Sequence, residues 1–265
     1  MNRNSLFNSA VLIFIFILSV LTTPISYSQE VVGLDTWFNH EINSSTGNAY
    51  HYLWNDTAMS GFSVWGEIFT EKGAVITTIG KPESKDLDRI DIYIIVDPDT
   101  TTENPSPNYI SVEDIKAVTG WVRNGGVLVV MANDAPNCEF THLNRLMKEF
   151  GMHFNHVTLH TVQGDDFNMG ASVDLPRSDL FRDVRKIYLK EISDISLSGN
   201  AQALLKEKGK VLMAETSYGK GYVFAIGDPW IYNEYIDHRR LPAGFDNMQA
   251  AEDLTDLLLE KAMPK

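Results

Sequence analysis

The segment GWVRNGGVLVVMANDAPN, residues 120–137, is the strongest indication of the fold in this sequence. A helix is expected to end at Gly125 and Gly126, and an unbroken apolar run, residues 127–131, follows at once. Such a run without alternation is typical of a strand buried on both faces, as in a parallel sheet between helices. Ligands of these sheets bind beyond the carboxyl ends of the strands, so Asn133 and Asp134 are candidate substrate-binding residues.

The segments on either side follow the same plan. Residues 31–35, 74–79 and 91–97 are predicted strands, and residues 61–72 and a segment capped by Ser111 are predicted helices. This alternation favours right-handed βαβ crossovers and a doubly wound, mostly parallel sheet. We expect the strand ends at Asp35, Asp97 and Asn133 to line one crevice.

The pattern changes in the second half of the chain. Asn137 is expected to cap a helix that ends at Phe150. Shorter predicted strands follow at residues 187–197, 201–205, 211–216 and 222–226, with a hairpin turn at residues 218–221. A terminal helix is predicted over residues 248–262. We therefore expect a C-terminal, β-rich extension of the sheet.

Length and composition bound the class of protein. The chain has 265 residues, a formal charge of -13 and 44% hydrophobic residues, which indicates a folded core. We expect one α/β domain over residues 29–265. The acidic balance argues against nucleic acid as a partner, because phosphate backbones need Lys and Arg. It leaves room for an anionic sugar, which needs only a local basic pocket.

Residues 1–28 have the three parts of a secretory signal peptide: Arg3, an apolar run over residues 10–21 and a small-x-small site at residues 26–28. A membrane anchor is the alternative, but the apolar run is short for a span. We expect cleavage near Gln29, a periplasmic or secreted protein, and no membrane contact after cleavage. Cys138 is the only cysteine, so no internal disulfide can form.

Two stretches resemble the class I glutamine amidotransferase-like fold, which is flavodoxin-like. Residues 125–130 (GGVLVV) are similar to its nucleophile strand, and residues 220–228 (KGYVFAIGD) to the strand before its catalytic histidine. The chain departs at both decisive positions. The elbow at residues 132–134 has no cysteine, Asp228 stands where the histidine would be, and Cys138 lies beyond the elbow. The departures argue against amidotransferase or cysteine-protease chemistry.

A second resemblance covers most of the chain after residue 28. It rests on the stretches HYLWND (51–56), SGFS (60–63), YIIVDPDT (93–100), PNYI (107–110), EFTHLNR (139–145) and GDPWIYNEY (227–235). They are similar to the uncharacterised domain that occurs alone or fused to unsaturated rhamnogalacturonyl hydrolases in polysaccharide-degrading Bacteroidetes. The resemblance implies breakdown of uronic-acid polysaccharides such as ulvan or rhamnogalacturonan, beside polysaccharide lyases and unsaturated uronyl hydrolases. It does not itself imply a reaction.

Glu139, His142 and Arg145 form the first candidate group, because residues three apart share a helix face. A histidine titrates near neutrality and can serve as base or acid. An arginine can hold a uronate carboxylate through two parallel hydrogen bonds. The alternative is a solvated helix face with an ordinary ion pair.

Asp97 and Asp99 form the second candidate group, at the end of a predicted buried strand. Two carboxylates there could hold a cation or act on a substrate hydroxyl. The alternative is a turn, in which Asp and Pro are common. The ligand spacing of calcium and zinc sites is absent, so we predict neither a metal nor a cofactor.

The third group follows the last predicted strand and contains Asp228, Trp230, Tyr232, Asn233, Glu234, Tyr235, His238, Arg239 and Arg240. Its aromatic rings could support a sugar, and the two arginines could bind an anionic substrate. The alternative is a loop packed by its own aromatic residues. His51 belongs to a fourth group, in the polar and aromatic segment 36–60, and is a further candidate for substrate binding.

These groups and the second resemblance lead to a predicted reaction. A base would remove the C5 hydrogen of a terminal uronate while the C4 hydroxyl leaves, which gives an unsaturated uronyl end. His142 or Tyr232 could be the base, Arg145 or Arg239 could hold the carboxylate, and Glu139 or Asp228 could be the acid. Two alternatives stay open: a glycoside hydrolase that uses Asp97 and Asp228, and a non-catalytic carbohydrate-binding module.

Overall fold

The computed structural model describes residues 29–263, so the predicted signal peptide lies outside the described residues. No helix between residues 29 and 263 is long and apolar enough to cross a bilayer. The first half contains β1 (Val31–Asp35), α1 (Ser63–Glu71), β2 (Val75–Ile79), α2 (Ser84–Leu87), β3 (Ile92–Val96), α3 (Val112–Asn124), β4 (Val127–Met131), α4 (Phe140–Lys148) and β5 (Met152–Phe154). The second half contains a 3-10 turn (Phe167–Gly170), β6 (Ala171–Ser172), β7 (Ile187–Tyr188), β8 (Ile195–Leu197), β9 (Gln202–Glu207), β10 (Lys210–Tyr218), β11 (Gly221–Ile226), α5 (Asn233–Ile236) and α6 (Asn247–Ala262).

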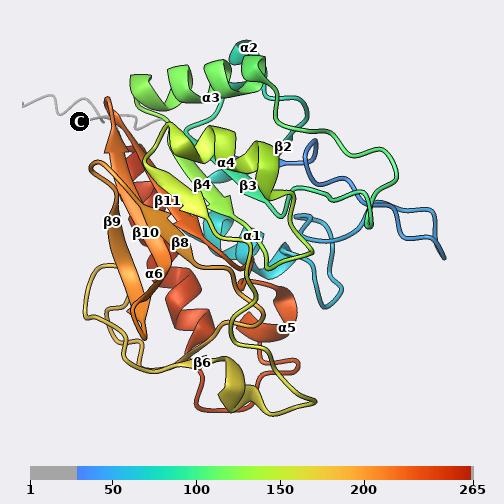
Figure 1. Ribbon diagram of the computed structural model, residues 1–265, viewed down its shortest axis with the longest axis vertical. Coiled ribbons are helices and arrows are strands. Elements are labelled where there is room, and N and C mark those ends of the chain that lie inside the picture. Colours follow the sequence, from blue (N-terminus) through green and yellow to red (C-terminus); the bar gives the residue numbers. More distant parts are fainter. Residues whose placement is uncertain (1–28, 264–265) are drawn as a thin grey trace, which may run out of the picture.

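A seven-stranded sheet in the order β2-β1-β3-β4-β11-β10-β9 organises the molecule (Figure 1). Strands β2, β1, β3, β4 and β11 are parallel, whereas β10 and β9 pair antiparallel at one edge. Every residue of β3, β4 and β11 is buried, as the apolar run in β4 predicts. The expected mixed α/β fold with a mostly parallel sheet is confirmed, and its C-terminal extension is antiparallel.

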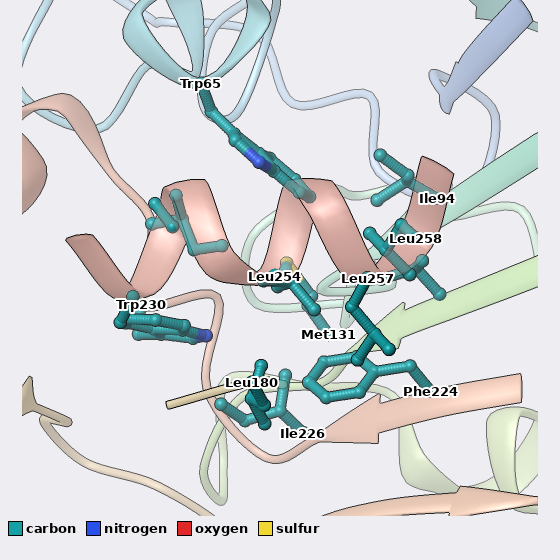
Figure 2. Packing of buried hydrophobic residues seen from close by; sticks show 14 of the residues in the cluster. Trp65, Ile94, Met131, Leu180, Phe224, Ile226, Trp230, Leu254, Leu257 and Leu258 are labelled. Carbon is teal, nitrogen blue, oxygen red and sulfur yellow. The ribbon is translucent and has the colours of Figure 1, made fainter. Parts of the chain in front are cut away.

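Side chains on the two faces of the sheet enter two hydrophobic cores. One core packs Ile94, Met131 and Phe224 of the sheet against α1 and α6, and Figure 2 shows Leu254, Leu257 and Leu258 of α6 in this core. The other core packs alternate residues of the same strands against α3 and α4. Two covered faces explain why the central strands are apolar without alternation.

The start of α4 and the segment before β8 differ from the prediction. Glu139, not Asn137, caps α4, because its carboxylate accepts hydrogen bonds from the backbone N–H groups of Thr141 and His142. Residues 187–197 are not one strand. β7 pairs with β6, β8 pairs with β5, and the residues between them form a loop beside the end of β11.

Gly227 is expected to be intolerant of a side chain. A Cβ at this position would lie 1.9 Å from the carbonyl oxygen of Ser193, in the loop beside β11. Because the Ser193 backbone would have to shift, Gly227→Ala should lower the free energy of unfolding by about 1–3 kcal/mol.

Gly120→Ala is the matched control. Gly120 lies in α3 with no atom within 4 Å of the added Cβ, so the free energy of unfolding should rise by up to about 1 kcal/mol. Urea denaturation measures both variants, and equal effects would contradict the packing described.

Candidate functional site

Strands of the parallel sheet end at one edge and carry polar side chains there. Asp97 directly follows β3, Asn133 lies two residues beyond β4, and Asp228 lies two residues beyond β11. Asn133 Nδ2 donates a hydrogen bond to Asp97 Oδ2 at 2.9 Å. The expectation that Asp97 and Asn133 meet at one edge is therefore confirmed.

Asp35 ends β1 at the same edge, but its side chain connects the turn after β1 to β3. Its Oδ2 accepts a hydrogen bond from the backbone N–H of Phe38 at 2.8 Å, and its Oδ1 accepts one from the Tyr93 hydroxyl at 2.7 Å. Burial raises the pKa of Asp35 to about 7. The expectation that Asp35 lines an open crevice is wrong, because both of its oxygens are used by the turn after β1 and by β3.

Two tyrosine–aspartate pairs face each other at this edge. The Tyr52 hydroxyl donates to Asp97 Oδ2 at 3.0 Å, and the Tyr232 hydroxyl lies 3.2 Å from Asp228 Oδ1. The two tyrosine ring centroids are 5.6 Å apart. We call Tyr52, Asp97, Asn133, Asp228 and Tyr232 the Tyr–Asp cluster. Asn133 and Tyr232 are the two members of the cluster that are partly exposed.

The two carboxyl groups of the cluster have unusual protonation. Asp97 is 4% exposed and Asp228 is 1% exposed. Burial raises the pKa of Asp228 to about 8, and it raises the pKa of Asp97 well above its ordinary value, with a further increase from the Glu103 carboxylate. Because a buried charge without a cation is costly, burial favours the neutral acid in both groups. Asp97 Oδ1 is also buried without a hydrogen-bond partner.

The backbone around the cluster adopts rare conformations. Asp97 has φ 40°, His51 has φ 66° and Tyr52 has φ 54°. Non-glycine residues rarely occupy the left-handed region, and strained residues of this kind gather at functional sites. This observation favours a functional role for the cluster over a purely structural one.

One lysine lies against the cluster. The backbone N–H of Lys190 donates to Asp228 Oδ2 at 2.8 Å, and its side-chain Nζ lies 3.1 Å from Glu191 Oε2. Lys190 belongs to the loop between β7 and β8, which the Ser193 N–H joins to Gly227 O through a 3.0 Å hydrogen bond. This loop therefore brings a cation to the edge where Asp228 is buried.

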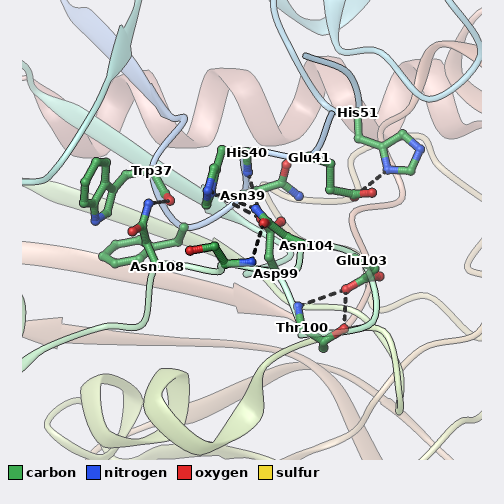
Figure 3. Close-up of polar contacts among 12 residues, drawn as sticks. Trp37, Asn39, His40, Glu41, His51, Asp99, Thr100, Glu103, Asn104 and Asn108 are labelled. Carbon is green, nitrogen blue, oxygen red and sulfur yellow. Dashed lines mark hydrogen bonds and ion pairs between the residues drawn. The ribbon is translucent and has the colours of Figure 1, made fainter. Parts of the chain in front are cut away.

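A glutamate–histidine pair lies beside Tyr52. His51 Nδ1 lies 3.0 Å from Glu41 Oε1, and the Tyr50 hydroxyl donates to Glu41 Oε2 at 3.0 Å. Glu41 is buried, whereas the side chain of His51 is 29% exposed. Figure 3 shows one ring nitrogen of His51 at Glu41 and the other directed away from it. The ring centroids of His51 and Tyr52 are 5.3 Å apart.

Asp99 organises the next part of the edge (Figure 3). Its Oδ2 accepts hydrogen bonds from the backbone N–H of His40 at 3.2 Å and from Asn104 Nδ2 at 2.7 Å. These contacts favour the turn-forming role over substrate binding. Within residues 29–263, no group of three or more His, Cys, Asp or Glu side chains is arranged to hold a metal ion.

Glu139 caps α4, His142 lies in its first turn and Arg145 lies in its last turn. His142 Nδ1 is 3.2 Å from Glu139 Oε1, and its ring stacks on Tyr109 with centroids 4.7 Å apart. Arg145 is exposed. No hydrogen bond or ion pair of the described chain joins these three side chains to the Tyr–Asp cluster. Their predicted catalytic and binding roles stay predictions.

The other predicted binding residues fall in different environments. Trp230 is 0% exposed and packs in the α1–α6 core, so its ring cannot support a sugar and that prediction is wrong (Figure 2). Asp134 is buried and accepts hydrogen bonds from Thr158 and Asn137. Arg239 is exposed, with Nε 2.5 Å from Asp237 Oδ2. Its Nη1 also donates to the carbonyl oxygen of Thr57 at 2.5 Å.

A cavity of about 690 Å³ lies at the opposite, amino-terminal edge of the parallel strands. Its walls include Gly125, Gly221, Tyr222 and Lys261. No carboxyl or imidazole group with a raised pKa lines it among the described residues. We therefore place the functional site at the carboxyl edge, where the titratable groups gather.

The sequence analysis missed two parts of the site. Glu41 was not singled out, although the density of polar and aromatic residues over 36–60 pointed to its segment. Lys190 was also missed, because residues 187–197 read as one strand, which would not carry a site loop. The presence of both an acidic residue and a histidine in this segment is the sequence signal that could have indicated the Glu41–His51 pair.

We expect the free energy of unfolding to fall as the pH rises from about 4 to about 8. Burial raises the pKa of Asp228 from 3.8 to about 8, so over this range the unfolded chain releases a proton that the folded protein keeps. Asp228→Asn has no such proton, so its unfolding free energy should fall less over the same range. Urea denaturation of both proteins across this range measures the difference, and parallel pH curves would contradict the protonation described.

Comparisons with known proteins bear on the fold alone. No family model matches the chain, and no curated protein matches it. Among solved structures, the mmIFT52 N-terminal domain aligns with a TM-score of 0.63 and 14% identity over 86% of this chain and 97% of that one. The cytoplasmic protein STM1381 of Salmonella typhimurium LT2 aligns with a TM-score of 0.55 and 14% identity over 87% and 98%. A putative ThuA-like protein of Bacteroides uniformis reaches a TM-score of 0.44 at 13% identity over 88% and 94%. The first two likenesses show that these chains share the overall fold.

Proposed function

We propose that this chain is a carbohydrate-active enzyme that removes water from the non-reducing terminal uronate of ulvan- or rhamnogalacturonan-type oligosaccharides. Its fold would be glutamine amidotransferase-like, with the chemistry moved from the usual cysteine and histidine to the Tyr–Asp cluster. The resemblance of the sequence supports this substrate class. The adjacency of β4 and β11 supports the fold, since these are the two strands that carry the resemblance.

The proposed reaction is a β-elimination. A base takes the C5 hydrogen as a proton, the C5–H electron pair forms the C4–C5 double bond, and the C4–O bond breaks. The leaving hydroxyl takes a proton from an acid and departs as water. The chemistry therefore needs a base, an acid that is protonated at neutral pH, and a group that holds the uronate carboxylate.

The burial of Asp228 beside Tyr232 is the observation that carries the proposal. Burial raises the pKa of Asp228 to about 8, so its carboxyl group holds a proton at neutral pH. Asp228 itself is 1% exposed, whereas Tyr232 is partly exposed and lies 3.2 Å from it. Tyr232 would therefore touch the substrate and pass the proton from Asp228 to the leaving hydroxyl.

The same geometry argues against Tyr232 as the base. Burial raises the pKa of Tyr232 well above its ordinary value, and the carboxyl group of Asp228 raises it further. A phenol with a raised pKa keeps its proton at neutral pH and acts as a donor. The acid side of the reaction is thus assigned to Tyr232 and Asp228, and the base lies elsewhere.

Lys190 is the cation that this site offers to a uronate carboxylate. Its backbone is fixed to Asp228, and its side chain is half-exposed with Glu191 as its ion-pair partner. Arg239 is held by Asp237 and by the carbonyl oxygen of Thr57. Arg145 is exposed on α4 beside His142. Lys190 is therefore favoured over both arginines as the carboxylate-binding group.

The protonation of the cluster weighs on the two alternatives. A hydrolase with Asp97 and Asp228 needs one ionised carboxylate as base or nucleophile, but burial raises the pKa of both groups. A binding module has no need of two buried neutral acids and three residues in the left-handed region. Elimination is therefore the better supported of the three.

Incubation with lyase-generated uronate oligosaccharides, followed by mass spectrometry, tests the proposal. We expect the wild-type protein to give a product lighter by one water, with the absorbance of an unsaturated uronate. A shorter oligosaccharide would indicate hydrolysis instead, and binding without any change in mass would indicate a binding module. Either result would overturn the proposed elimination.

Substitutions in the acid pair should reduce turnover. Tyr232→Phe and Asp228→Asn each remove a proton-transfer group, so kcat should fall by about 10²- to 10⁴-fold while oligosaccharide binding persists. Tyr218→Phe is the control, because the Tyr218 hydroxyl contacts Arg123 away from the cluster. Steady-state kinetics and calorimetry on folded variants measure these effects. Unchanged kcat in Tyr232→Phe would remove Tyr232 from the mechanism.

A further inference from the structure

The acid pair leaves the base of the reaction unassigned. Asp97 and Asp228 are buried neutral acids, and Tyr52 and Tyr232 have raised pKa values for the same reason. None of these groups is suited to accept a proton at neutral pH. A histidine at the edge of the cluster is the remaining candidate for the base, since an imidazole accepts a proton near neutrality.

We propose that His51 is the base of this site and that Glu41 positions it. This inference rests on the proposed elimination and names a residue that the reaction needs. Its evidence is the geometry of the two side chains, their burial and their place beside the Tyr–Asp cluster.

The Glu41–His51 pair fixes one protonation form of the imidazole. Glu41 Oε1 is 3.0 Å from His51 Nδ1, and a carboxylate accepts, so Nδ1 carries the hydrogen and Nε2 keeps a lone pair. The Tyr50 hydroxyl donates to the other carboxylate oxygen at 3.0 Å and prevents its rotation. Figure 3 shows the second ring nitrogen of His51 directed away from Glu41, where the side chain is exposed. Nε2 is therefore free to take a proton from a ligand.

The position of His51 connects it to the acid pair. Its ring centroid lies 5.3 Å from that of Tyr52, which in turn lies 5.6 Å from that of Tyr232. Tyr52 is the member of the cluster that contacts His51, and its hydroxyl donates to Asp97 Oδ2 at 3.0 Å. Tyr52 itself is buried, whereas His51 and Tyr232 are partly exposed. A sugar that contacts both His51 and Tyr232 would have a base and an acid at its two ends, which suits removal of a proton from one carbon and hydroxide from the next.

The other histidines near this edge are less suited to the role. His40 has Nε2 2.9 Å from Asn104 Nδ2 and Nδ1 3.2 Å from Asp99 Oδ2, so both nitrogens are enclosed. His160 has Nδ1 3.0 Å from the Leu189 carbonyl oxygen and Nε2 3.3 Å from Glu207 Oε2. His142 stacks on Tyr109 and shares its carboxylate partner with the cap of α4. His51 alone among these four combines a free nitrogen with contact to the cluster.

The proton balance closes within the site. His51 Nε2 takes the C5 proton and becomes an imidazolium, whose charge the Glu41 carboxylate stabilises. Tyr232 passes the Asp228 proton to the C4 oxygen, which leaves as water. His51 then loses its proton to solvent and Asp228 regains one, so the enzyme returns to its starting state without a co-reactant.

Chemical rescue tests the base assignment. His51→Ala should lower kcat by about 10²- to 10⁴-fold on the oligosaccharides that the wild-type protein converts. Added imidazole should restore part of this loss, because a small base can enter the space of the missing ring, which a purely structural defect would not allow. His153→Ala is the matched control: His153 is exposed on β5, and its kcat should equal that of the wild type.

Two substitutions of Glu41 test its positioning role. Glu41→Gln keeps an oxygen that accepts from His51 Nδ1, so kcat should fall by about tenfold. Glu41→Ala removes that oxygen and should reduce kcat nearly as far as His51→Ala. KM should change little in both variants if Glu41 acts through His51. Equal kcat in the two variants would show that Glu41 does not act through this hydrogen bond.

The outcomes separate the inference from the proposed function. A wild-type protein that removes no water from any uronate oligosaccharide overturns both. A wild-type protein that does so, with a folded His51→Ala variant of unchanged kcat, overturns the base assignment alone. If His142→Ala then loses turnover and regains it with imidazole, the base is His142 on α4.

Discussion

Two carboxyl groups buried at the carboxyl edge of the sheet, Asp97 and Asp228, are the constraint on which the site depends. Neither has a cation within ion-pair distance among the described residues, and each is held by hydrogen bonds from neutral donors. Removal of a carboxylate from water without a counter-charge favours the neutral acid. Burial therefore favours the protonated form of both Asp97 and Asp228, whereas an exposed aspartate is ionised at neutral pH.

The parallel sheet creates this condition. β3, β4 and β11 are buried on both faces by helices, so whatever follows them enters a region with little solvent. The segment 36–60 covers Asp97 at this edge. Asn39 Nδ2 donates to the Asp97 carbonyl oxygen at 2.9 Å, and the Tyr52 hydroxyl donates to the Asp97 carboxyl group. The same segment carries Glu41 and His51. One segment thus covers Asp97 and carries the candidate base.

The fold could be predicted from the sequence because its signals are local. The apolar run at residues 127–131 requires cover on both faces, and parallel strands end at the same edge, so Asp97 and Asn133 had to meet. The pairing of Glu41 with His51 could not be predicted, because it depends on the path of an irregular segment. Such a segment has no regular spacing of apolar residues from which its path could be read. Trp230 was misplaced for a related reason: local sequence does not show whether a ring after a strand turns toward solvent or into the core. The sequence analysis assigned the cap of α4 to Asn137 instead of Glu139, because side chains of both residue types can accept hydrogen bonds from the first backbone N–H groups of a helix.

The proposed mechanism requires a protonated Asp228, and the carbon-13 resonance of its carboxyl group reports this protonation. Protein labelled at aspartate carboxyl carbons, with Asp228→Asn to assign the signal, would be titrated between pH 4 and pH 9. We expect one carboxyl resonance, lost in Asp228→Asn, that titrates with a midpoint of about 8. A midpoint near the ordinary aspartate value of about 4 would show that the carboxylate is charged at neutral pH, and the proposed acid would be lost.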